Sequence, residues 1–363
     1  MESEPTRRLS RLTPIADVLA RAATLARPVA AREAAIADAE GRVLAADACV
    51  STSWPAGAIA LRDGWAVRAE TIADAGPYTP VPIAAPQWVD AGMAMPPTAD
   101  AILPRDAVML AVGAAEALSP ATSGDGVLAA GADAAPGKPL RRAGETLRAV
   151  DVAALQRAGV ARVSIREPRV RVVSVGADAV ALAISRGVAA HGANVIFVRA
   201  LERALADEHT DLVITIGGTG EGRDDGSVAL LARMGEILVH GFGIAPGEAA
   251  AFGVVKGHPV LMLPDRLDAA LAAFLIVGRP LLRGLGGSTD ADTGVRLPLA
   301  RKIVSTVGLA EVIPVRRVGS DIEPLASGHW PLQALTRADG WVLVPPESEG
   351  FAAGTLVEMR AFP

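Results

Sequence analysis

Cysteine is almost absent from this chain. Its 363 residues include one cysteine, Cys49, which excludes an internal disulfide framework and a metal site built from cysteine alone. Aromatic residues make up 3% of the chain, and its five histidines show no paired ligand spacing. Basic runs are also missing and the net charge is −5, so we expect no nucleic-acid partner bound through phosphate neutralisation.

Long apolar runs are absent as well. The longest, Ala269 to Gly278, is about half the length that a membrane-spanning helix needs. The first eight residues carry two glutamates and two arginines and lead into no apolar stretch, so no signal peptide is visible. We therefore expect a cytoplasmic protein without a membrane partner.

The remaining composition is that of a globular protein, because 51% of the residues are hydrophobic and 21% are charged. Near the start, Thr13-Pro14 precedes apolar residues at helical spacing, which predicts a helix with Thr13 as N-cap and Pro14 in its first position. A second helix is predicted over residues 31–38 and a strand over residues 42–52. From residue 53 to about 141, abundant proline and glycine with short apolar runs predict a small β domain with irregular loops.

From Arg169 onward, buried strands alternate with helices, which predicts βαβ units and a parallel sheet. A Gly/Ser/Thr/Asp linker follows Gly287, and the short alternating segments after it predict a small β barrel. The expected fold class is multidomain α/β. Its predicted domains are a helical and linker region (1–52 with 138–168), a small β domain (53–137), a parallel-sheet α/β domain (169–287) and a C-terminal β barrel (295–363).

The sharpest motif is DLVITIGGTGEGRDD, residues 211–225. A buried strand ends in Gly-Gly-Thr-Gly, and a helix is predicted from Ser227. Ligands of open parallel sheets bind outside the carboxyl ends of the strands, where this loop falls. Glycines let backbone N–H groups surround an anion, and the helix N-terminus adds a favourable dipole. The loop is therefore a candidate phosphate site, although many glycine-rich turns bind nothing.

Asp224 and Asp225 precede the predicted helix. Such carboxylates either cap the helix or hold Mg²⁺ beside a phosphate, and local sequence alone favours capping.

This motif resembles the pterin-binding loop of the molybdopterin adenylyltransferases and molybdenumtransferases. A second segment, ALRDGWAVRAE (60–70), resembles the Met-Asp-Gly-Tyr-Ala-Val-Arg signature of the same family, with Arg62 and Trp65 as replacements. The segments AGMAMPPTADAILPRDAV, KPLRRAGET, GHPVLMLP and VPPESEGFAAGTLVEM then follow in the family's order. Because the resemblance covers nearly the whole chain, the sequence is identified as a diverged member of the molybdopterin molybdenumtransferase family.

The resemblance implies an enzyme that binds molybdopterin-adenylate and molybdate, inserts molybdenum and releases AMP with help from Mg²⁺. It also implies an elongated homodimer in which Asp63 of one subunit faces the glycine-rich loop of the other. Further partners would be a molybdopterin adenylyltransferase or a client molybdoenzyme. The expected site residues are Asp63, Asp178 and Asp225 for catalysis; Gly217, Gly218, Thr219, Gly220, Asp211, Gly247 and Arg266 for pterin binding; and Asp224 and Asp225 for the metal.

The chain also departs from the family pattern. The family's Lys-Pro-Gly-Lys-Pro segment is here Ala245 to Ala249, with Glu248 in place of the second lysine, and a glutamate repels anions. The family's Leu-Pro-Gly-Asn-Pro loop is replaced by LPDRL, which contains Arg266. The polar stretch that follows the family's counterpart of Asp178 is missing.

Two functions are consistent with these departures. The first is an active transferase whose lost cations are replaced by arginines, with Arg62, Arg105, Arg141, Arg142, Arg223 and Arg266 as candidates. The second is a carrier or maturation factor that binds the cofactor without inserting the metal. A dinucleotide-binding enzyme is set aside, because the first strand of the predicted α/β domain is not followed by G-x-G-x-x-G. His240 and His258 flank predicted strand ends, from which they could reach the mouth of the pocket, but we expect each to be an ordinary surface or turn residue.

Overall fold

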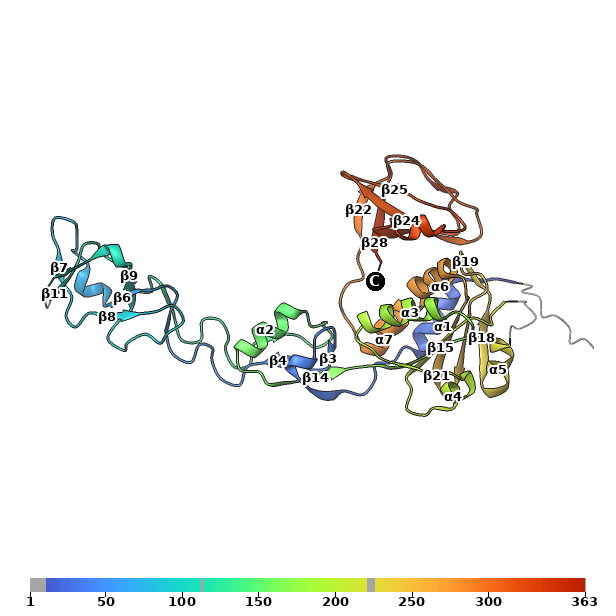
Figure 1. Ribbon diagram of the computed structural model, residues 1–363, viewed down its shortest axis with the longest axis horizontal. Coiled ribbons are helices and arrows are strands. Elements are labelled where there is room, and N and C mark those ends of the chain that lie inside the picture. The colour runs from blue at the N-terminus through green and yellow to red at the C-terminus, as the bar shows by residue number, and fades with distance from the viewer. Residues whose placement is uncertain (1–10, 112–113, 221–225, 363) are drawn as a thin grey trace, which may run out of the picture.

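The computed structural model describes residues 11–111, 114–220 and 226–362. Figure 1 shows an elongated molecule with a small β unit at one end, a middle unit next to it, and an α/β unit with a C-terminal β unit above it at the other end. This arrangement confirms the predicted multidomain α/β class.

The small β unit consists of short strands and 3₁₀ turns around two apolar clusters. Its sheets have the orders β8-β6-β9, β10-β11-β7 and β12-β5. Its elements are β5 (Ile59–Ala60), β6 (Gly64–Val67), η2 (Ala69–Ile72), β7 (Val81–Pro82), β8 (Gln87–Val89), β9 (Ala101–Leu103), η3 (Arg105–Ala107), β10 (Val108–Ala111), β11 (Ala114–Ala117) and β12 (Val127–Leu128).

The middle unit combines chain segments from both sides of the small β unit. The predicted helix over residues 31–38 is wrong: Arg32–Ala35 form a strand that pairs antiparallel with β14, and only Ile36–Asp38 make a helical turn. Pairing with a distant strand here outweighs local helix propensity. Its elements are β2 (Arg32–Ala35), η1 (Ile36–Asp38), β3 (Val43–Leu44), β4 (Ala48–Cys49), β13 (Pro139–Arg141), α2 (Ala149–Arg157) and β14 (Arg162–Arg166).

The α/β unit contains a six-stranded sheet in the order β16-β15-β17-β21-β20-β18. Strands β16, β15, β17 and β21 are parallel, and all five residues of the central strand β17 are buried. Its elements are β15 (Arg169–Ser174), α3 (Asp178–Ala190), β16 (Asn194–Phe197), α4 (Leu201–Ala206), β17 (Leu212–Ile216), α5 (Ser227–Met234), β18 (Glu236–His240), β19 (Phe242–Ala245), β20 (Ala251–Val255), β21 (His258–Leu263), α6 (Leu267–Ala273), η4 (Phe274–Gly278) and α7 (Arg279–Gly286).

One side of this sheet is antiparallel, which the predicted parallel sheet did not include. Strand β20 runs opposite to both β18 and β21. The turn between β20 and β21 consists of Lys256 and Gly257, both with positive φ. This is the backbone of a two-residue hairpin turn. Two reversals in succession leave β18 running in the same direction as β21.

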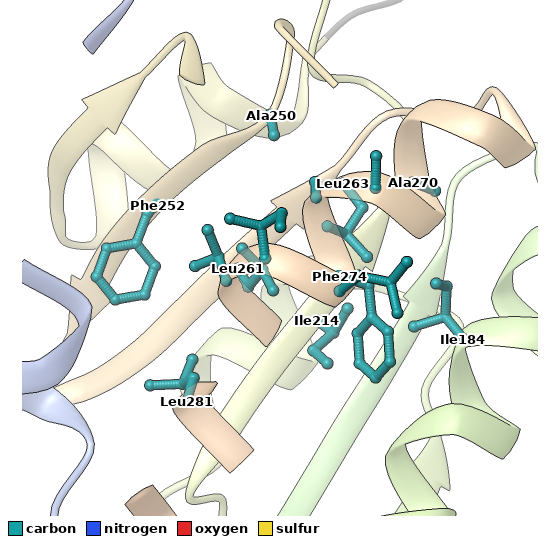
Figure 2. Packing of buried hydrophobic residues seen from close by; sticks show 14 of the residues in the cluster. Ile184, Ile214, Ala250, Phe252, Leu261, Leu263, Ala270, Phe274 and Leu281 are labelled. Carbon is teal, nitrogen blue, oxygen red and sulfur yellow. The ribbon is translucent and has the colours of Figure 1, made fainter. Parts of the chain in front are cut away.

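The main apolar cluster fills the space between this sheet and its covering helices. Figure 2 shows Ile214 and Leu261 of the sheet close to Phe274 and Ile184 of the helices. Helices α6, η4 and α7 join into one continuous helix, Leu267–Gly286. By length and composition it is apolar enough to cross a membrane, but 72% of its apolar window is buried, as in the core helix of a soluble protein.

The N-terminal segment packs on the α/β unit, although the predicted boundary groups it with residues 138–168. Helix α1 (Ile15–Leu25) contributes Ile15, Val18 and Ala22 to the main cluster. The predicted cap is wrong: α1 has no side-chain cap, and Thr13 and Pro14 form a short strand, β1, parallel to β19. The Thr13 N–H donates to the carbonyl of Gly241, so this end of the chain is held by sheet pairing.

The C-terminal unit is an antiparallel sheet in the order β24-β26-β28-β22 around its own apolar cluster. Strand β19 also pairs in parallel with the start of β24, which continues this sheet into the α/β unit. Its elements are β22 (Val295–Pro298), β23 (Ile303–Val304), β24 (Ala310–Val318), β25 (Asp321–Pro324), α8 (Leu332–Leu335), β26 (Gly340–Val344), β27 (Gly350–Phe351) and β28 (Leu356–Ala361).

Candidate functional site

The carboxyl ends of three parallel strands meet at one edge of the α/β sheet. Strands β15, β17 and β21 end at Ser174, Ile216 and Leu263. The N–H of Val175 donates to Ile216 O at 2.8 Å, and the N–H of Gly217 donates to Leu263 O at 2.8 Å. The segments that follow the three strands therefore leave the sheet next to one another, at the edge where such sheets bind ligands.

The glycine-rich loop after β17 requires its first two glycines. Gly217 and Gly218 have φ angles of 96° and 72°, a region that other residues rarely adopt. A Cβ atom on Gly217 would lie 2.4 Å from Val175 O, and one on Gly218 would lie 2.3 Å from Ser227 Oγ. The backbone thus packs too closely for any side chain at either position.

Ser227 and His240 hold three carbonyl groups of the loop. Ser227, the first residue of α5, donates from Oγ to Gly217 O and from its N–H to Gly218 O, both at 3.1 Å. His240 Nε2 lies 3.0 Å from Thr219 O. The sequence signal for His240 was its position at a strand end near the mouth of the pocket, but an ordinary surface or turn residue was expected and the contact with Thr219 was not predicted.

The α5 N-terminus points its dipole toward this edge, which favours a negatively charged group. The predicted catalytic and metal residue Asp225, the predicted metal residue Asp224 and the candidate cation Arg223 lie outside the described residues. Gly220, the last described residue of the loop, is half-buried.

Asp178 lies at the same edge, as the first residue of α3, and its side chain is exposed. The turn before it is tied by a hydrogen bond from the Ala177 N–H to Ser174 Oγ, 3.2 Å long. The structure therefore brings Asp178 to the same edge as the glycine-rich loop, and its catalytic role stays a prediction.

Arg266 also lies at this edge, after β21, but its guanidinium is paired. It donates to the Asp268 carboxylate, with the shorter contact at 2.7 Å. Asp268 in turn accepts from the Trp330 N–H at 3.0 Å and lies 2.8 Å from His329 Nδ1, both in the C-terminal unit. Arg266 thus belongs to a polar cluster that joins two units of the molecule.

Burial alone raises the pKa of Asp268. Its hydrogen bonds outweigh burial and lower the pKa to about 2; they come from the Arg266 side chain, the Trp330 N–H, the His329 side chain and the Ala269 N–H. The carboxylate stays charged at neutral pH and neutralises Arg266.

Gly247 lies in the turn after β19, next to α6. Its φ is 124°, and a Cβ atom there would lie 2.8 Å from Ile244 Cδ1 and 3.2 Å from Ala269 O. Its N–H donates to the Glu248 carboxylate at 3.0 Å. The turn is tightly packed, and an acidic group occupies one of its N–H donors.

A cavity of about 470 Å³ lies between the end of β19 and the C-terminal unit. Ala245 lines it on one side, and Ser305, Glu311 and Ser327 line it on the other. Glu311 is buried and accepts hydrogen bonds from Ser327 Oγ at 2.6 Å and the Gly328 N–H at 2.7 Å. Among the described residues that line this cavity, none is a lysine or arginine.

Asp211 is not brought to the loop. It precedes β17 and therefore lies at the opposite end of that strand from Gly217. Its carboxylate accepts hydrogen bonds from the N–H and the guanidinium of Arg169, between 2.7 and 3.0 Å. The geometry gives Asp211 a structural contact at the amino edge of the sheet.

Asp63 lies in the small β unit, at the far end of the molecule from the sheet (Figure 1). Its Oδ1 accepts the Ala91 N–H at 2.7 Å and the side chain is exposed. The dipeptide Asp63-Gly64 is also of the type most often used in hairpin turns. No hairpin forms here, because β5 pairs with β12 and β6 pairs with β8 and β9. Within one chain, Asp63 and the loop do not meet.

The other candidate cations lie in the small β and middle units. Arg62 donates to Ile102 O at 2.6 Å, and Arg141 pairs with Glu145 at 3.1 Å. Arg105 and Arg142 are exposed.

No group of three histidine, cysteine, aspartate or glutamate side chains that would hold a metal ion occurs within the described parts of the chain. The predicted Mg²⁺ ligands Asp224 and Asp225 lie outside these parts, so the metal site stays a prediction.

Three family models match consecutive parts of the chain. The MoeA N-terminal region (domain I and II) matches residues 13–159, a probable molybdopterin binding domain matches residues 177–284, and the MoeA C-terminal region (domain IV) matches residues 296–362.

Curated relatives match along the same span. Molybdopterin molybdenumtransferases 1 and 2 of Mycobacterium tuberculosis are 25% and 28% identical, over 94% and 89% of this chain and 96% and 93% of their own. A putative molybdopterin biosynthesis protein of Methanocaldococcus jannaschii is 29% identical, over 44% of this chain and 38% of its own.

Crystal structures of a molybdopterin biosynthesis MoeA protein from Pyrococcus horikoshii share the fold. One superimposes with a TM-score of 0.77 at 21% identity and another with 0.72 at 26%, each over 97% of this chain and 100% of the other.

Proposed function

We propose, since the chain belongs to the molybdopterin molybdenumtransferase (MoeA) family of molybdenum cofactor biosynthesis proteins, that it inserts molybdenum from molybdate into adenylated molybdopterin and releases AMP. The observation that carries the proposal is the glycine-rich loop at the carboxyl edge of the α/β sheet, inside the segment that matches a molybdopterin binding domain.

The loop is suited to the phosphate groups of the substrate. Gly217 and Gly218 allow the loop its positive φ angles and its close packing on Val175 and Ser227, and the α5 dipole favours the negative charge. In this proposal Gly217 to Gly220 bind the phosphates, and Asp178 orients the pterin from the neighbouring strand exit.

The proposal extends to a homodimer in the cytoplasm. Asp63 is exposed and lies far from the loop of its own chain, so a second subunit is needed to bring the two together. Asp225 and Mg²⁺ complete the proposed site, together with a molybdopterin adenylyltransferase as donor or a molybdoenzyme as recipient.

The missing lysines weaken the site for molybdate rather than for the pterin. Glu311 lines the cavity beside β19 and places negative charge there, and Glu248 adds a carboxylate in the turn after β19. Both charges oppose the entry of an oxyanion. We therefore expect a high KM for molybdate, with the backbone N–H groups and the α5 dipole as the remaining attraction at the pterin loop.

The test is an assay of AMP release from molybdopterin-adenylate, Mg²⁺ and molybdate, with pterin binding measured beside it. Gly218→Ala should lower AMP release by about tenfold or more, because the residue needs a positive φ and its Cβ would collide with Ser227 Oγ. Gly226→Ala is the matched control, since it has a φ of −102° and open space around its Cβ.

Molybdate-dependent release that Gly218→Ala and Asp225→Ala both reduce, and that Gly226→Ala leaves intact, supports the transferase. Tight pterin binding by the wild-type protein without AMP release contradicts the transferase and leaves a carrier of the cofactor.

A further inference from the structure

His240 must donate its hydrogen bond to the loop. A carbonyl oxygen offers only lone pairs, so Nε2, 3.0 Å from Thr219 O, carries the hydrogen. This contact fixes which ring nitrogen is protonated, and it leaves Nδ1 on the other side of the ring.

His240 reaches the loop from a strand that does not belong to it. Strand β18 runs in the same direction as β21, so its last residue lies at the carboxyl edge of the sheet with the loop. Thr219 is 2% exposed. His240 therefore contacts a buried residue of the loop from β18, the last strand in the order of the sheet.

Three successive carbonyl groups of the loop accept hydrogen bonds from the protein. Gly217 O and Gly218 O are taken by Ser227, and Thr219 O is taken by His240. A carbonyl oxygen that faces a phosphate repels it, whereas one that is hydrogen-bonded to the protein behind is turned away. The Gly217 N–H donates to Leu263 O, so with three successive carbonyls fixed in this way an anion would be received by the N–H groups that follow it in the loop.

We propose that His240 is a positioning residue: by donating from Nε2 to Thr219 O, it holds the glycine-rich loop in the conformation that receives the phosphate of the pterin substrate. The part of this inference that concerns the substrate rests on the proposed function. The part that concerns the loop does not.

Two substitutions separate the hydrogen bond from the size of the side chain. The Gln side-chain amide reaches as far as Nε2 of histidine, so His240→Gln should keep the donor, whereas the shorter His240→Asn should lose it. In the ligand-free protein, hydrogen–deuterium exchange of the peptide 212–220 should become roughly fivefold faster in His240→Asn and stay near wild type in His240→Gln.

The same pair is tested with substrate. His240→Asn should raise the KM and the Kd for molybdopterin-adenylate by roughly fivefold, with kcat little changed, and His240→Gln should restore both. His258→Asn is the matched control, because His258 begins β21 at the opposite edge of the same sheet.

Exchange and pterin affinity in His240→Asn that equal those of the wild type would overturn the proposal, as would an equal defect in His240→Gln. A wild-type protein that releases no AMP, with the loop of His240→Asn still exchanging faster, refutes the proposed transferase but leaves the positioning role.

Discussion

Asp268 connects the α/β unit to the C-terminal unit through one carboxylate. The residue is 3% exposed and accepts hydrogen bonds from Arg266 on its own side and from the Trp330 N–H on the other. A group whose pKa is lowered in the folded state stabilises it above the unfolded pKa and loses that effect as pH falls through the folded pKa. For Asp268, with a pKa of about 2, the loss falls between about pH 4 and pH 2.

Asp268→Asn should therefore lower the free energy of unfolding by about 2 kcal/mol at neutral pH. Urea unfolding of both proteins along a pH series measures the effect, and the difference between them should shrink as the pH approaches 2. Asp265→Asn is the control, because Asp265 is exposed. A difference that stays constant down to pH 2 would rule out the carboxylate charge as its source.

For single residues, the conformation of the loop glycines was easier to predict than the hydrogen-bond partners of polar side chains. Gly217 and Gly218 follow a buried strand in the sequence, and their positive φ angles match the close approach expected there. His240 is 21 residues from Thr219, and no local pattern couples them. Arg266 was expected to bind the ligand, but its guanidinium forms an ion pair with Asp268, two residues later.

The turn after β19 lies beside a cavity that Glu311 makes acidic. Ala245 lines the cavity, and Glu248 follows in the same turn. Both positions correspond to lysines in the family pattern. Restoring the lysines should add attraction for molybdate without altering the pterin loop.

The double variant Ala245→Lys/Glu248→Lys is expected to lower the KM for molybdate about fivefold or more and to leave the KM for molybdopterin-adenylate within twofold. Steady-state AMP release at varied molybdate measures both. Glu202→Lys, an exposed position on α4, controls for net charge. Equal molybdate KM values in all three proteins would show that the cavity does not receive molybdate.

Elements were predictable where local periodicity decides them and not where distant pairing does. The strand and helix succession from β15 to α5 was predicted from apolar runs and glycines. Residues 32–35 read as helical but pair with residues 162–165. Thr13 and Pro14 read as a helix start but pair with Phe242 and Gly243. The Lys256-Gly257 hairpin turn was present in the sequence and was not recognised.

At the scale of the whole molecule, the separation of Asp63 from the loop makes the proposed dimer testable. If each site takes Asp63 from one subunit and the loop from the other, variants in the two places should complement one another. Asp63→Asn and Gly218→Ala should each be nearly inactive alone.

Mixing the two variants with subunit exchange should restore about a quarter of the wild-type AMP release, because half of the dimers are then mixed and each has one intact site. Equal mixtures before and after exchange are compared in the same assay. No recovery despite exchange, shown by mass measurement of mixed dimers, would place both residues in the same subunit's site.

The multidomain α/β class could be predicted from the sequence because each unit has its own pattern. The contacts between the units could not be predicted. They are made by strand β19, which pairs with β1 on one side and β24 on the other, and by the buried carboxylate of Asp268. Both depend on residues far apart in the chain.

The pairing of β1 with β19 has a consequence for synthesis on the ribosome. Thr13 pairs with Phe242, so 229 further residues must be synthesised before the strand that pairs with β1 begins to form. At roughly 5–20 residues per second, this takes on the order of 10–50 seconds. For that time the apolar face of α1, formed by Ile15, Val18 and Ala22, has no sheet to cover it. Within the described residues, the first helix to be synthesised is thus among the last to be buried, and until then only factors that bind the nascent chain can shield it.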